Sequence, residues 1–336
     1  MKIIIPMAGM GKRMRPHTLT IPKPLIPVAG KPIVQRLAED IVKICEEKVE
    51  EIAFIIGDFG AEVEERLIGI AEKLGAKGSI YYQHEPLGTA HAILCAGESL
   101  EGKIIVAFAD TLFKADFVLD ENQDGIIWVH EVDDPSAFGV VKTDENEFIT
   151  DFIEKPKEFI SNKAIIGIYY FKDGAYLRDE LQYLIDNNVI KSNEYQLTDA
   201  LQNMMKKGSR FAVGKVNEWL DCGNKDATVI TNRRLLENSN GDKLIADNAK
   251  ITNSIINHPC YIGDNVEITS SIIGPYVSIG ENCKVSHSII TDTIIQTNAK
   301  IKNANIDNSM IGSYVEYRGD INELSIGDFT TINYNV

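Results

Sequence analysis

The residues with the clearest chemical potential lie between Gly9 and Pro27, directly after the apolar run Ile3-Ile4-Ile5. Gly9 and Gly11 let the backbone approach a ligand closely, because glycine has no side chain. Four positive charges follow in the same segment, on Lys12, Arg13, Arg15 and Lys23. Backbone N–H groups and fixed cations at the end of a strand favour the binding of a polyphosphate.

Two well-known phosphate-binding loops do not fit this segment. A dinucleotide-binding fold requires G-x-G-x-x-G, and Met14 occupies the third glycine position. A P-loop requires Gly-Lys followed by Ser or Thr, and here Gly11-Lys12 is followed by Arg13. What remains is G-x-G-x-R with a later Pro-Lys-Pro-Leu around Lys23. A solvated basic loop is the alternative to a phosphate site.

Composition restricts the partners of the chain. Its 336 residues include 34 Lys and Arg against 49 Asp and Glu, which gives a net charge of −15. This charge argues against a surface for nucleic acid or for an anionic membrane. No apolar run approaches membrane-spanning length, and the apolar start is too short for a signal peptide, so we expect a soluble cytoplasmic protein. The five cysteines are scattered without C-x-x-C, which indicates reduced thiols.

Alternating strands and helices must position the glycine-rich segment. The apolar patterns predict strands over 2–6, 51–57, 79–84 and 103–109, and helices over 32–47, 61–74 and 89–97. This order predicts a Rossmann-like, mostly parallel sheet with helices on both faces. Ligands of such sheets bind beyond the carboxyl ends of the strands, where Gly9, the segment 84–88 and Asp110 all fall.

The pattern changes completely from Leu244 onward. Aliphatic residues recur every five or six positions from Ile245 to Ile311, and a longer repeat reads DNAKITNSII, DNVEITSSII, ENCKVSHSII and TNAKIKNANI. Such a period predicts a β-helix of hexapeptide repeats with three short strands per coil. The polar stretch before it predicts a linker. We therefore expect a catalytic domain over 1–230, a linker over 231–243 and a β-helix over 244–336.

Taken in order, these motifs resemble the sugar-1-phosphate nucleotidylyltransferases (NDP-sugar pyrophosphorylases), several of which carry a left-handed β-helix after the catalytic domain. The resemblance rests on the segments GMGKR, PKPL, QHEPLGTA, FAD, FGVV, IEKP and WLDCG. It implies that a nucleoside triphosphate and a sugar 1-phosphate are converted to an NDP-sugar and pyrophosphate, with Mg²⁺ as cofactor. The attacking phosphate oxygen is already an anion, so positioning and charge stabilisation matter more than a general base.

The resemblance also assigns roles to single residues. It implies three catalytic cations, which are Arg13, Lys23 and Lys155. The expected nucleotide-binding residues are Gly9, Gly11, Gln83, Gly88 and Thr89. The expected sugar-binding residues are Gly139, Glu154, Gly167 and Glu194. The expected Mg²⁺ ligands are Asp110, preceded by alanine where the family usually has glycine, and Asp221.

Some of these residues also have an ordinary structural interpretation. Thr89 fits the N-cap of its helix, and Asp221 fits a turn. Glu154 and Lys155 could be a solvated pair on one strand. Because neighbouring strand residues point to opposite faces, both can reach one ligand only at a bend, which we expect Pro156 to supply.

The substrate and the role of the β-helix stay open at this stage. Glucose-1-phosphate thymidylyltransferase is the first choice, and mannose-1-phosphate guanylyltransferase is the alternative. A non-catalytic regulatory homologue that binds a sugar nucleotide is the alternative from another class. Acyl transfer would need a catalytic histidine, but His287 occupies a repeat position that Asn253, Ser270 and Asn303 hold in other coils. We expect the β-helix to form a homo-oligomer.

Overall fold

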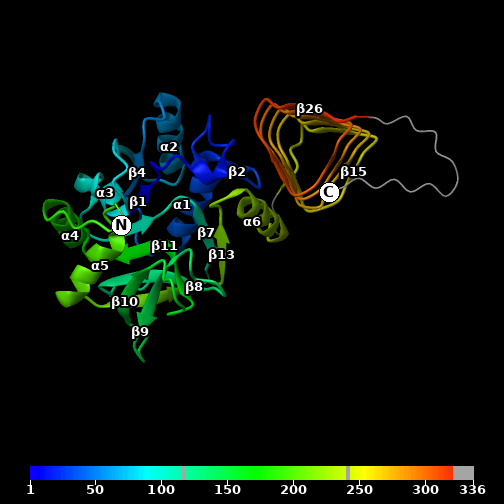
Figure 1. Ribbon diagram of the computed structural model, residues 1–336. Helices are drawn as coiled ribbons and strands as arrows, with labels where there is room; N and C mark the ends of the chain where they lie inside the picture. Colours follow the sequence, from blue (N-terminus) through cyan, green and yellow to red (C-terminus); the bar gives the residue numbers. More distant parts are fainter. Residues whose placement is uncertain (116–118, 192, 240–242, 321–336) are drawn as a thin grey trace. The chain divides into compact units, whose positions relative to one another are not determined.

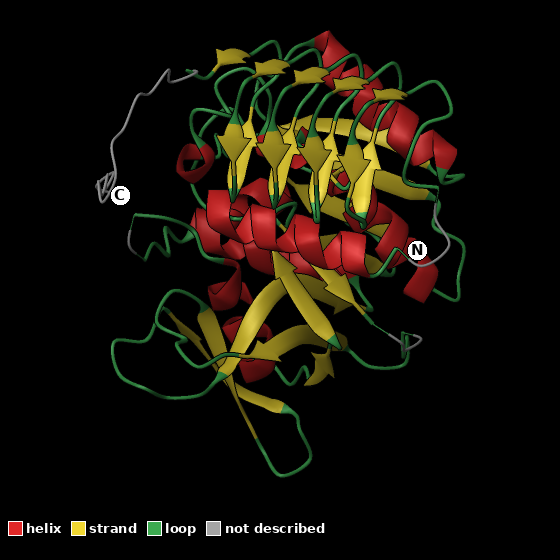
Figure 2. Cartoon of the chain, turned by 90° about the vertical axis from the view of Figure 1, so that its right-hand side faces the viewer, coloured by secondary structure: helices red, strands yellow, loops and turns green. Residues whose placement is uncertain are grey.

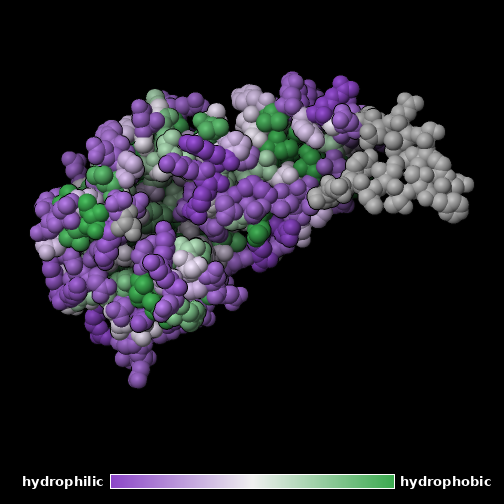
Figure 3. Space-filling model, viewed as in Figure 1, coloured by the Kyte–Doolittle hydropathy of each residue, from purple (hydrophilic) through white to green (hydrophobic). Residues whose placement is uncertain are grey.

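The computed structural model describes residues 1–115, 119–191, 193–239 and 243–320. The chain divides into two compact units, one over Met1–Thr231 and one from Asn232 onward. Each unit has a hydrophobic core of its own. No helix in the described ranges is long and apolar enough to cross a membrane, and apolar residues form only small separate patches on the surface shown in Figure 3.

The first unit is built around a nine-stranded sheet in the order β10-β9-β11-β6-β1-β4-β5, with β8 pairing both β11 and β12. The strands are β1 (Lys2–Pro6), β4 (Glu51–Ile56), β5 (Lys77–Tyr82), β6 (Ile104–Ala107), β8 (Gly125–Glu131), β9 (Gly139–Thr143), β10 (Ile149–Glu154), β11 (Lys163–Phe171) and β12 (Phe211–Lys215). Figure 1 shows helices on either side of this sheet. The predicted α/β fold class is confirmed.

The half of the sheet made by β6, β1, β4 and β5 is parallel, as predicted. Its central strands are apolar runs buried on both faces, which is typical of strands covered by helices. The helices are α1 (Ile33–Ile44), α2 (Ala61–Lys73), α3 (Thr89–Leu94), α4 (Gly174–Asp186) and α5 (Leu197–Lys206). All predicted strands and helices of residues 2–109 are present, with ends that differ by a few residues.

The other half of the sheet is mixed. Strand β11 runs antiparallel to β6, β8 and β9, and β9 runs antiparallel to β10, whereas β12 is parallel to β8. Two small pairs lie outside the main sheet: β2 (Pro27–Val28) with β3 (Lys31–Pro32), and β7 (Thr111–Lys114) with β13 (Glu218–Asp221). The β7–β13 pair is antiparallel. It places the WLDCG motif, which carries Asp221, beside the residues that follow the FAD motif, which carries Asp110.

Helix α6 (Lys225–Glu237) runs across the boundary between the two units. The first half of the predicted linker is therefore helical. Asn232 is fully buried in the second unit, where its side-chain amide donates to the carbonyl of Tyr276 at 3.2 Å and its oxygen accepts from the hydroxyl of Ser278 at 2.7 Å. The helix end is thus part of the second unit's packing.

The second unit is a left-handed β-helix with three parallel sheets, seen along its axis as a triangle in Figure 1 and from the side as a stack of parallel strands in Figure 2. The first sheet contains β14 (Lys250–Thr252), β17 (Glu267–Thr269), β20 (Lys284–Ser286), β23 (Lys300–Lys302) and β26 (Glu316–Arg318). The second contains β15 (Ile255–Ile256), β18 (Ile272–Ile273), β21 (Ile289–Ile290) and β24 (Asn305–Ile306). The third contains β16 (Cys260–Ile262), β19 (Val277–Ile279), β22 (Thr293–Ile295) and β25 (Ser309–Ile311).

Residues with positive φ form the corners of the coils. One corner is made by Asn265, Asn282 and Asn298, with φ of 56°, 59° and 60°. Asparagine tolerates this left-handed conformation better than most residues. The amide of Asn265 also donates to the side-chain oxygen of Asn282 at 3.2 Å, so the corners form a ladder along the stack. The asparagines of the sequence repeat therefore turn the chain.

Candidate active site

The glycine-rich segment is folded by contacts of its own. Gly11 has φ of 55° and precedes the short 3-10 helix Lys12–Met14. The hydroxyl of Thr18 donates to the carbonyl of Gly11 at 2.9 Å. A Cβ atom on Gly11 would lie 3.0 Å from Cβ of Lys23, so the missing side chain lets the loop close on this lysine. Arg13 lies on the short helix and is exposed.

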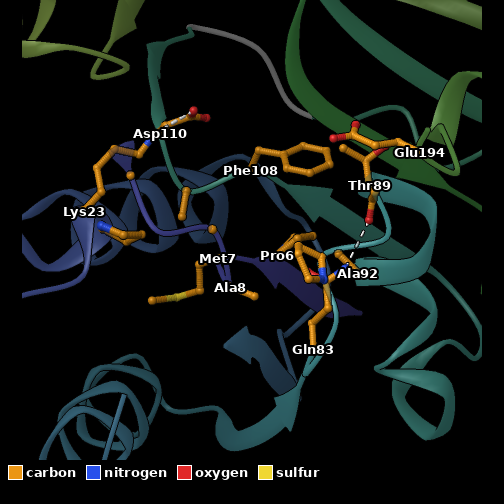
Figure 4. Close-up of a pocket in the computed structure, with 16 residues that line it drawn as sticks. Pro6, Met7, Ala8, Lys23, Gln83, Thr89, Ala92, Phe108, Asp110 and Glu194 are labelled. Atoms are coloured by element: carbon orange, nitrogen blue, oxygen red, sulfur yellow. Dashed lines mark hydrogen bonds and ion pairs between the residues drawn. The ribbon is translucent and has the colours of Figure 1, made fainter. Parts of the chain in front are cut away.

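A cavity of about 280 Å³ opens beyond the carboxyl ends of β1, β5 and β6 (Figure 4). Its wall includes all the predicted nucleotide-binding residues, Gly9, Gly11, Gln83, Gly88 and Thr89. It also includes Lys23, Asp110 and Glu194. In Figure 4 Lys23 and Asp110 lie at one end, Thr89 and Glu194 lie at the other, and the Phe108 ring lies between them. The structure thus brings together residues from four of the sequence motifs and from the segment around Glu194.

An ion pair joins the cation and the carboxylate at one end of the cavity. The ammonium group of Lys23 donates to Oδ2 of Asp110 at 2.8 Å. The lysine side chain is 13% exposed and that of the aspartate 37%. Each charge is partly withdrawn from water, so each depends on its partner more than a surface charge would.

Asp221 lies next to this ion pair because of the β7–β13 pairing. Asp221 faces Thr111 in the register of the two strands, and the N–H of Cys222 donates to the carbonyl of Asp110 at 2.9 Å. Burial raises the pKa of Asp221, and the negative charge of Asp110 raises it further; the N–H of Gly223 opposes both by donating to Oδ1 at 2.9 Å. The structure therefore places two mutually repelling carboxylates side by side.

The donor set at Asp110 and Asp221 fits a hard cation such as Mg²⁺, since it consists of carboxylate oxygens whose repulsion a cation would relieve. Burial raises the pKa of the neighbouring Cys222 thiol to about 12, so this sulfur is not a metal-binding thiolate. The described ranges contain no cluster of three or more His, Cys, Asp and Glu side chains that could hold a metal. Two carboxylates alone would leave most of the coordination to phosphate oxygens and water.

The predicted sugar-binding residues Gly139 and Glu154 face each other across the β9–β10 pair. A Cβ atom on Gly139 would lie 3.0 Å from Oε2 of Glu154, so glycine makes room for this carboxylate. Burial raises the pKa of Glu154, the Lys155 ammonium lowers it, and the charges of Glu194 and Asp199 raise it. Glu154 and Glu194, although from different motifs, thus lie within electrostatic reach of each other.

The chain does bend after Glu154, but not at the expected residue. Lys155 itself takes φ of 44°, so the bend precedes Pro156. Its ammonium group comes within 3.9 Å of Oε1 of Glu154 and its side chain is 67% exposed. A left-handed lysine costs on the order of 1 kcal/mol or more. The charged ends of the two side chains are therefore close together, although neighbouring residues of a straight strand point to opposite faces.

Gly167 lies behind the cavity rather than in its wall. It has φ of 85°, and the N–H of Phe108 donates to its carbonyl at 2.9 Å. Its contact with a sugar stays a prediction.

Phe108 was not predicted from the sequence, yet it stands two positions before Asp110 and lines the same cavity. The two-residue period of an extended chain could have identified it.

Three predicted nucleotide-binding residues are held by the protein itself. The side-chain amide of Gln83 donates to the carbonyl of Gly88 at 3.2 Å and lies 3.1 Å from Nδ1 of His91. Gly88 has φ of 113°, and its Cβ position is filled by the backbone of Tyr195 at 2.5 Å, so glycine is required there by packing. Thr89 is not the N-cap of α3, since Gly88 holds that position.

A second cavity of about 540 Å³ lies on another side of the glycine-rich segment. It shares Ala8, Gly9, Gln83 and Pro86 with the first cavity and adds apolar side chains such as Phe59. The segment around Gly9 is thus open to solvent-accessible space in more than one direction. Consistent with this, a Cβ atom on Gly9 would meet nothing within 4 Å.

Comparison with known protein families gives two matches along the chain. The profile described as "Nucleotidyl transferase" matches residues 2–238, and the profile described as "GlmU-like, C-terminal hexapeptide" matches residues 238–301. The predicted resemblance and the β-helix are confirmed by these matches.

Several curated proteins are similar to this chain. "Low-salt glycan biosynthesis nucleotidyltransferase Agl11" of Haloferax volcanii is 30% identical over 265 residues, which cover 76% of this chain and 72% of that protein. "Bifunctional protein GlmU" of Methanococcus aeolicus is 32% identical over 72% of this chain and 56% of its own length. "Mannose-1-phosphate guanylyltransferase catalytic subunit beta" of Drosophila melanogaster is 31% identical over 66% and 59%. The match spans less than two thirds of the last two proteins.

A solved structure has the same architecture over most of the chain. The crystal structure of UDP-glucose pyrophosphorylase complexed with UDP-glucose superposes with a TM-score of 0.57 at 26% sequence identity. The superposition covers 70% of this chain and 98% of that one.

Proposed function

This chain belongs to the nucleotidyl transferase family of enzymes, and from that membership we propose that it transfers a nucleotidyl group from a nucleoside triphosphate to a sugar 1-phosphate. The observation that carries this proposal is the cavity that joins Gly9, Lys23, Gln83, Asp110 and Glu194. These residues come from separate motifs, and each supplies a function that the reaction requires: backbone donors, a cation, an amide for a base, a carboxylate for a metal and a carboxylate for a sugar.

The proposed reaction needs no general base. A phosphate oxygen of the sugar 1-phosphate attacks the α-phosphorus of the nucleotide, and the bond from that phosphorus to the pyrophosphate oxygen breaks. Negative charge then accumulates on the pyrophosphate. We assign its stabilisation to Lys23, to the backbone N–H groups near Gly9 and Gly11, and to the exposed guanidinium of Arg13.

Asp110 and Asp221 are the residues that would hold Mg²⁺. The ion would supply positive charge that screens the repulsion between the two phosphate substrates. Their proximity, and the rise in the pKa of Asp221 caused partly by Asp110, support this assignment. The sugar would lie toward Glu154 and Glu194, with Lys155 near its phosphate.

The β-helix offers a surface for self-association. Ile255, Ile272 and Ile289 form a column on one outer face, because each pairs with the next in the parallel register. They are 58%, 37% and 48% exposed. Aliphatic side chains in a row on a flat face are typical of a subunit contact. We therefore propose a homo-oligomer formed through this unit.

Our first choice of substrates is a thymidine triphosphate with glucose 1-phosphate, and GTP with mannose 1-phosphate is the second. The second pair is favoured by the 31% identity to a mannose-1-phosphate guanylyltransferase subunit. The test is a panel in which each of the common nucleoside triphosphates is combined with glucose, mannose or N-acetylglucosamine 1-phosphate. Pyrophosphate release and the mass of the product identify the pair.

We expect one pair to exceed the others in kcat/KM and to require Mg²⁺. A folded protein that binds a sugar nucleotide but releases no pyrophosphate with any pair would contradict the proposal and favour the regulatory alternative. That alternative is less consistent with the chain, because Arg13, Lys23, Asp110, Lys155 and Asp221 are all present.

A further inference from the structure

Two segments that lie far apart in the sequence are joined backbone to backbone at the edge of the cavity. The N–H of Tyr195 donates to the carbonyl of Leu87 at 2.8 Å, and the N–H of Ala90 donates to the carbonyl of Tyr195 at 3.0 Å. Gly88 allows this approach, since a Cβ atom there would lie 2.5 Å from the Tyr195 carbonyl oxygen. The turn on the nucleotide side of the cavity therefore fixes the position of the segment that carries Glu194.

The backbone of Glu194 is fixed from its other side as well. Lys191 and Glu194 exchange two backbone hydrogen bonds, each of 3.0 Å. The ammonium group of Lys191 also pairs with the carboxylate of Asp199 on helix α5. Backbone contacts alone do not orient a glutamate side chain, which has three rotatable bonds. A further contact is needed to hold its carboxylate in one place.

That contact comes from Gln196. Its side-chain amide nitrogen donates to Oε2 of Glu194 at 3.0 Å. The amide is itself oriented by Thr89, whose hydroxyl donates to Oε1 of Gln196 at 3.5 Å. The hydroxyl accepts the N–H of Leu197 at 3.0 Å, which leaves its own hydrogen for Gln196. Because the Leu197 N–H can only donate, the Thr89 hydroxyl accepts from it and donates to Gln196. This fixes which group donates in each hydrogen bond from Leu197 to Glu194.

We propose that Gln196 is a positioning residue for the sugar substrate, and that Thr89 acts through it. Gln196 holds Oε2 of Glu194, so Oε1, which has no partner in the described part of the chain, can accept a sugar hydroxyl. The inference rests on the proposed function, because it needs Glu194 to bind the sugar. It also gives Thr89 a second task at the boundary between the nucleotide and sugar ends of the cavity.

The first test compares Gln196→Leu with the wild-type protein and with Gln182→Leu as a matched control. Gln182 also donates to a carboxylate, that of Asp186, on the exposed face of helix α4. With the best substrate pair, Gln196→Leu should raise KM for the sugar 1-phosphate about two- to tenfold, the value of one hydrogen bond, and leave KM for the nucleotide within about twofold. Gln182→Leu should change neither constant.

Gln196→Glu gives a signature that a structural role would not produce. It sets a second carboxylate against Glu194, and like charges favour a shared proton. At neutral pH, KM of this variant for the sugar 1-phosphate should therefore exceed the KM of Gln196→Leu. As the pH falls and the pair of carboxylates takes up a proton, KM should decrease to the Gln196→Leu value or below it. Thr89→Val should raise the same KM, and Thr89→Ser should recover most of the loss, because serine retains the hydroxyl.

The outcomes separate this inference from the proposed function. If the wild-type protein transfers no nucleotidyl group, the proposed function is wrong and the inference falls with it. If the wild type is active and Gln196→Leu and Gln196→Glu both keep the wild-type KM for the sugar 1-phosphate, only the positioning role is wrong. If Gln196→Leu does not fold, Thr89→Val against Thr89→Ser decides by the same constant.

Discussion

Asp110 and Asp221 have different partners, and we expect this difference to separate their contributions to stability. Asp110 is paired with Lys23 at 2.8 Å, whereas Asp221 has its pKa raised, first by burial and then by the charge of Asp110. A carboxyl group with a raised folded-state pKa binds its proton more tightly in the folded than in the unfolded chain. Its ionisation therefore lowers the free energy of unfolding as the pH rises through that pKa.

We predict that Asp221→Asn lowers turnover at least about tenfold, as loss of a metal ligand should, without lowering the melting temperature at pH 7. Asparagine removes the charge that burial disfavours and retains an oxygen for the N–H of Gly223. Thermal unfolding at several pH values checks this. Any gain in stability should disappear near pH 3, where the wild-type carboxyl is also protonated.

Asp110→Asn is the matched variant. It should lower turnover similarly, yet gain no stability at pH 7, because it leaves the partly buried ammonium group of Lys23 without its charged partner. Equal melting curves for the two variants would contradict the electrostatic difference between the two aspartates. Turnover equal to wild type in both would remove them from the metal site.

The residues that the sequence could assign to one cavity are those whose types suggest their proposed chemistry. Lys23, Asp110 and Gln83 could be predicted because a cation, a carboxylate and an amide each stand in a distinctive motif. Gln196 could not, since nothing in the sequence near it indicates that its partners are Glu194 and a threonine from another segment. Such a role depends on a tertiary contact.

Among the elements of the cavity wall, two glycines differ in the space around their Cβ positions. Gly88 has φ of 113° and ψ of 178°, a conformation almost restricted to glycine, and lies against the Tyr195 backbone. Gly9 has open space around its Cβ position. Packing therefore requires glycine at position 88, whereas we expect position 9 to require it for the binding of the ligand.

We predict that Gly88→Ala lowers the free energy of unfolding by about 2–4 kcal/mol, from backbone strain and the clash together. Gly9→Ala should change it by less than about 1 kcal/mol but raise KM for the nucleotide, because its methyl group enters space that the ligand needs. Denaturant unfolding and steady-state kinetics of the two variants check this. The reverse order of the two stabilities would contradict it.

His287 belongs to a corner of the β-helix. Its φ of 50° matches those of Asn253, Ser270 and Asn303 at the equivalent positions, which are 49°, 48° and 52°. We predict that His287→Asn keeps the free energy of unfolding within about 0.5 kcal/mol and leaves nucleotidyl transfer unchanged. An acetyl-CoA-dependent activity that the wild type shows and the variant loses would instead assign the histidine to acyl transfer.

The elements that repeat or alternate were the most predictable. The strands of residues 2–109 and the coils of the β-helix follow from local apolar patterns, because these patterns indicate which face of each element is buried. The mixed half of the sheet did not follow, because β11 pairs with three antiparallel strands that only the tertiary structure selects. The bend at Lys155 was expected at the next residue, Pro156, because proline is the usual sequence signal for a bend. No sequence signal indicates that a lysine takes the left-handed conformation.

The proposed site and the proposed assembly surface belong to different units of the chain. All proposed site residues precede Thr231, at which the first compact unit ends. The exposed isoleucine column belongs to the second unit. The domain boundaries expected at 230 and 243 stay a prediction, but the helical segment up to Glu237 shows why composition alone marks such a boundary poorly.

We predict that truncation after Lys243 retains measurable nucleotidyl transfer and lowers the number of subunits. The truncated protein should also be less soluble than one that ends at Thr231. The longer form keeps Asn232 and Leu236, which are 0% and 1% exposed in the intact chain, but lacks the coils that Asn232 bonds. Sedimentation and a pyrophosphate assay on both forms check this.

An inactive but folded truncated protein would indicate that the β-helix supports the site. An active one with an unchanged number of subunits would mean that assembly does not depend on the β-helix. The second result would favour a regulatory or acyl-transfer role for this unit.

The pairing register of the coils restricts which insertions and deletions the β-helix can accept during evolution. Within the described residues, each inner strand of the β-helix pairs with its equivalents one coil before and one coil after, as β20 does with β17 and β23. A duplication or deletion of one complete coil would restore every corner and every ladder, whereas most other lengths would break them. The second unit can therefore lengthen or shorten by complete coils without any change in the residues that line the cavity of the first unit.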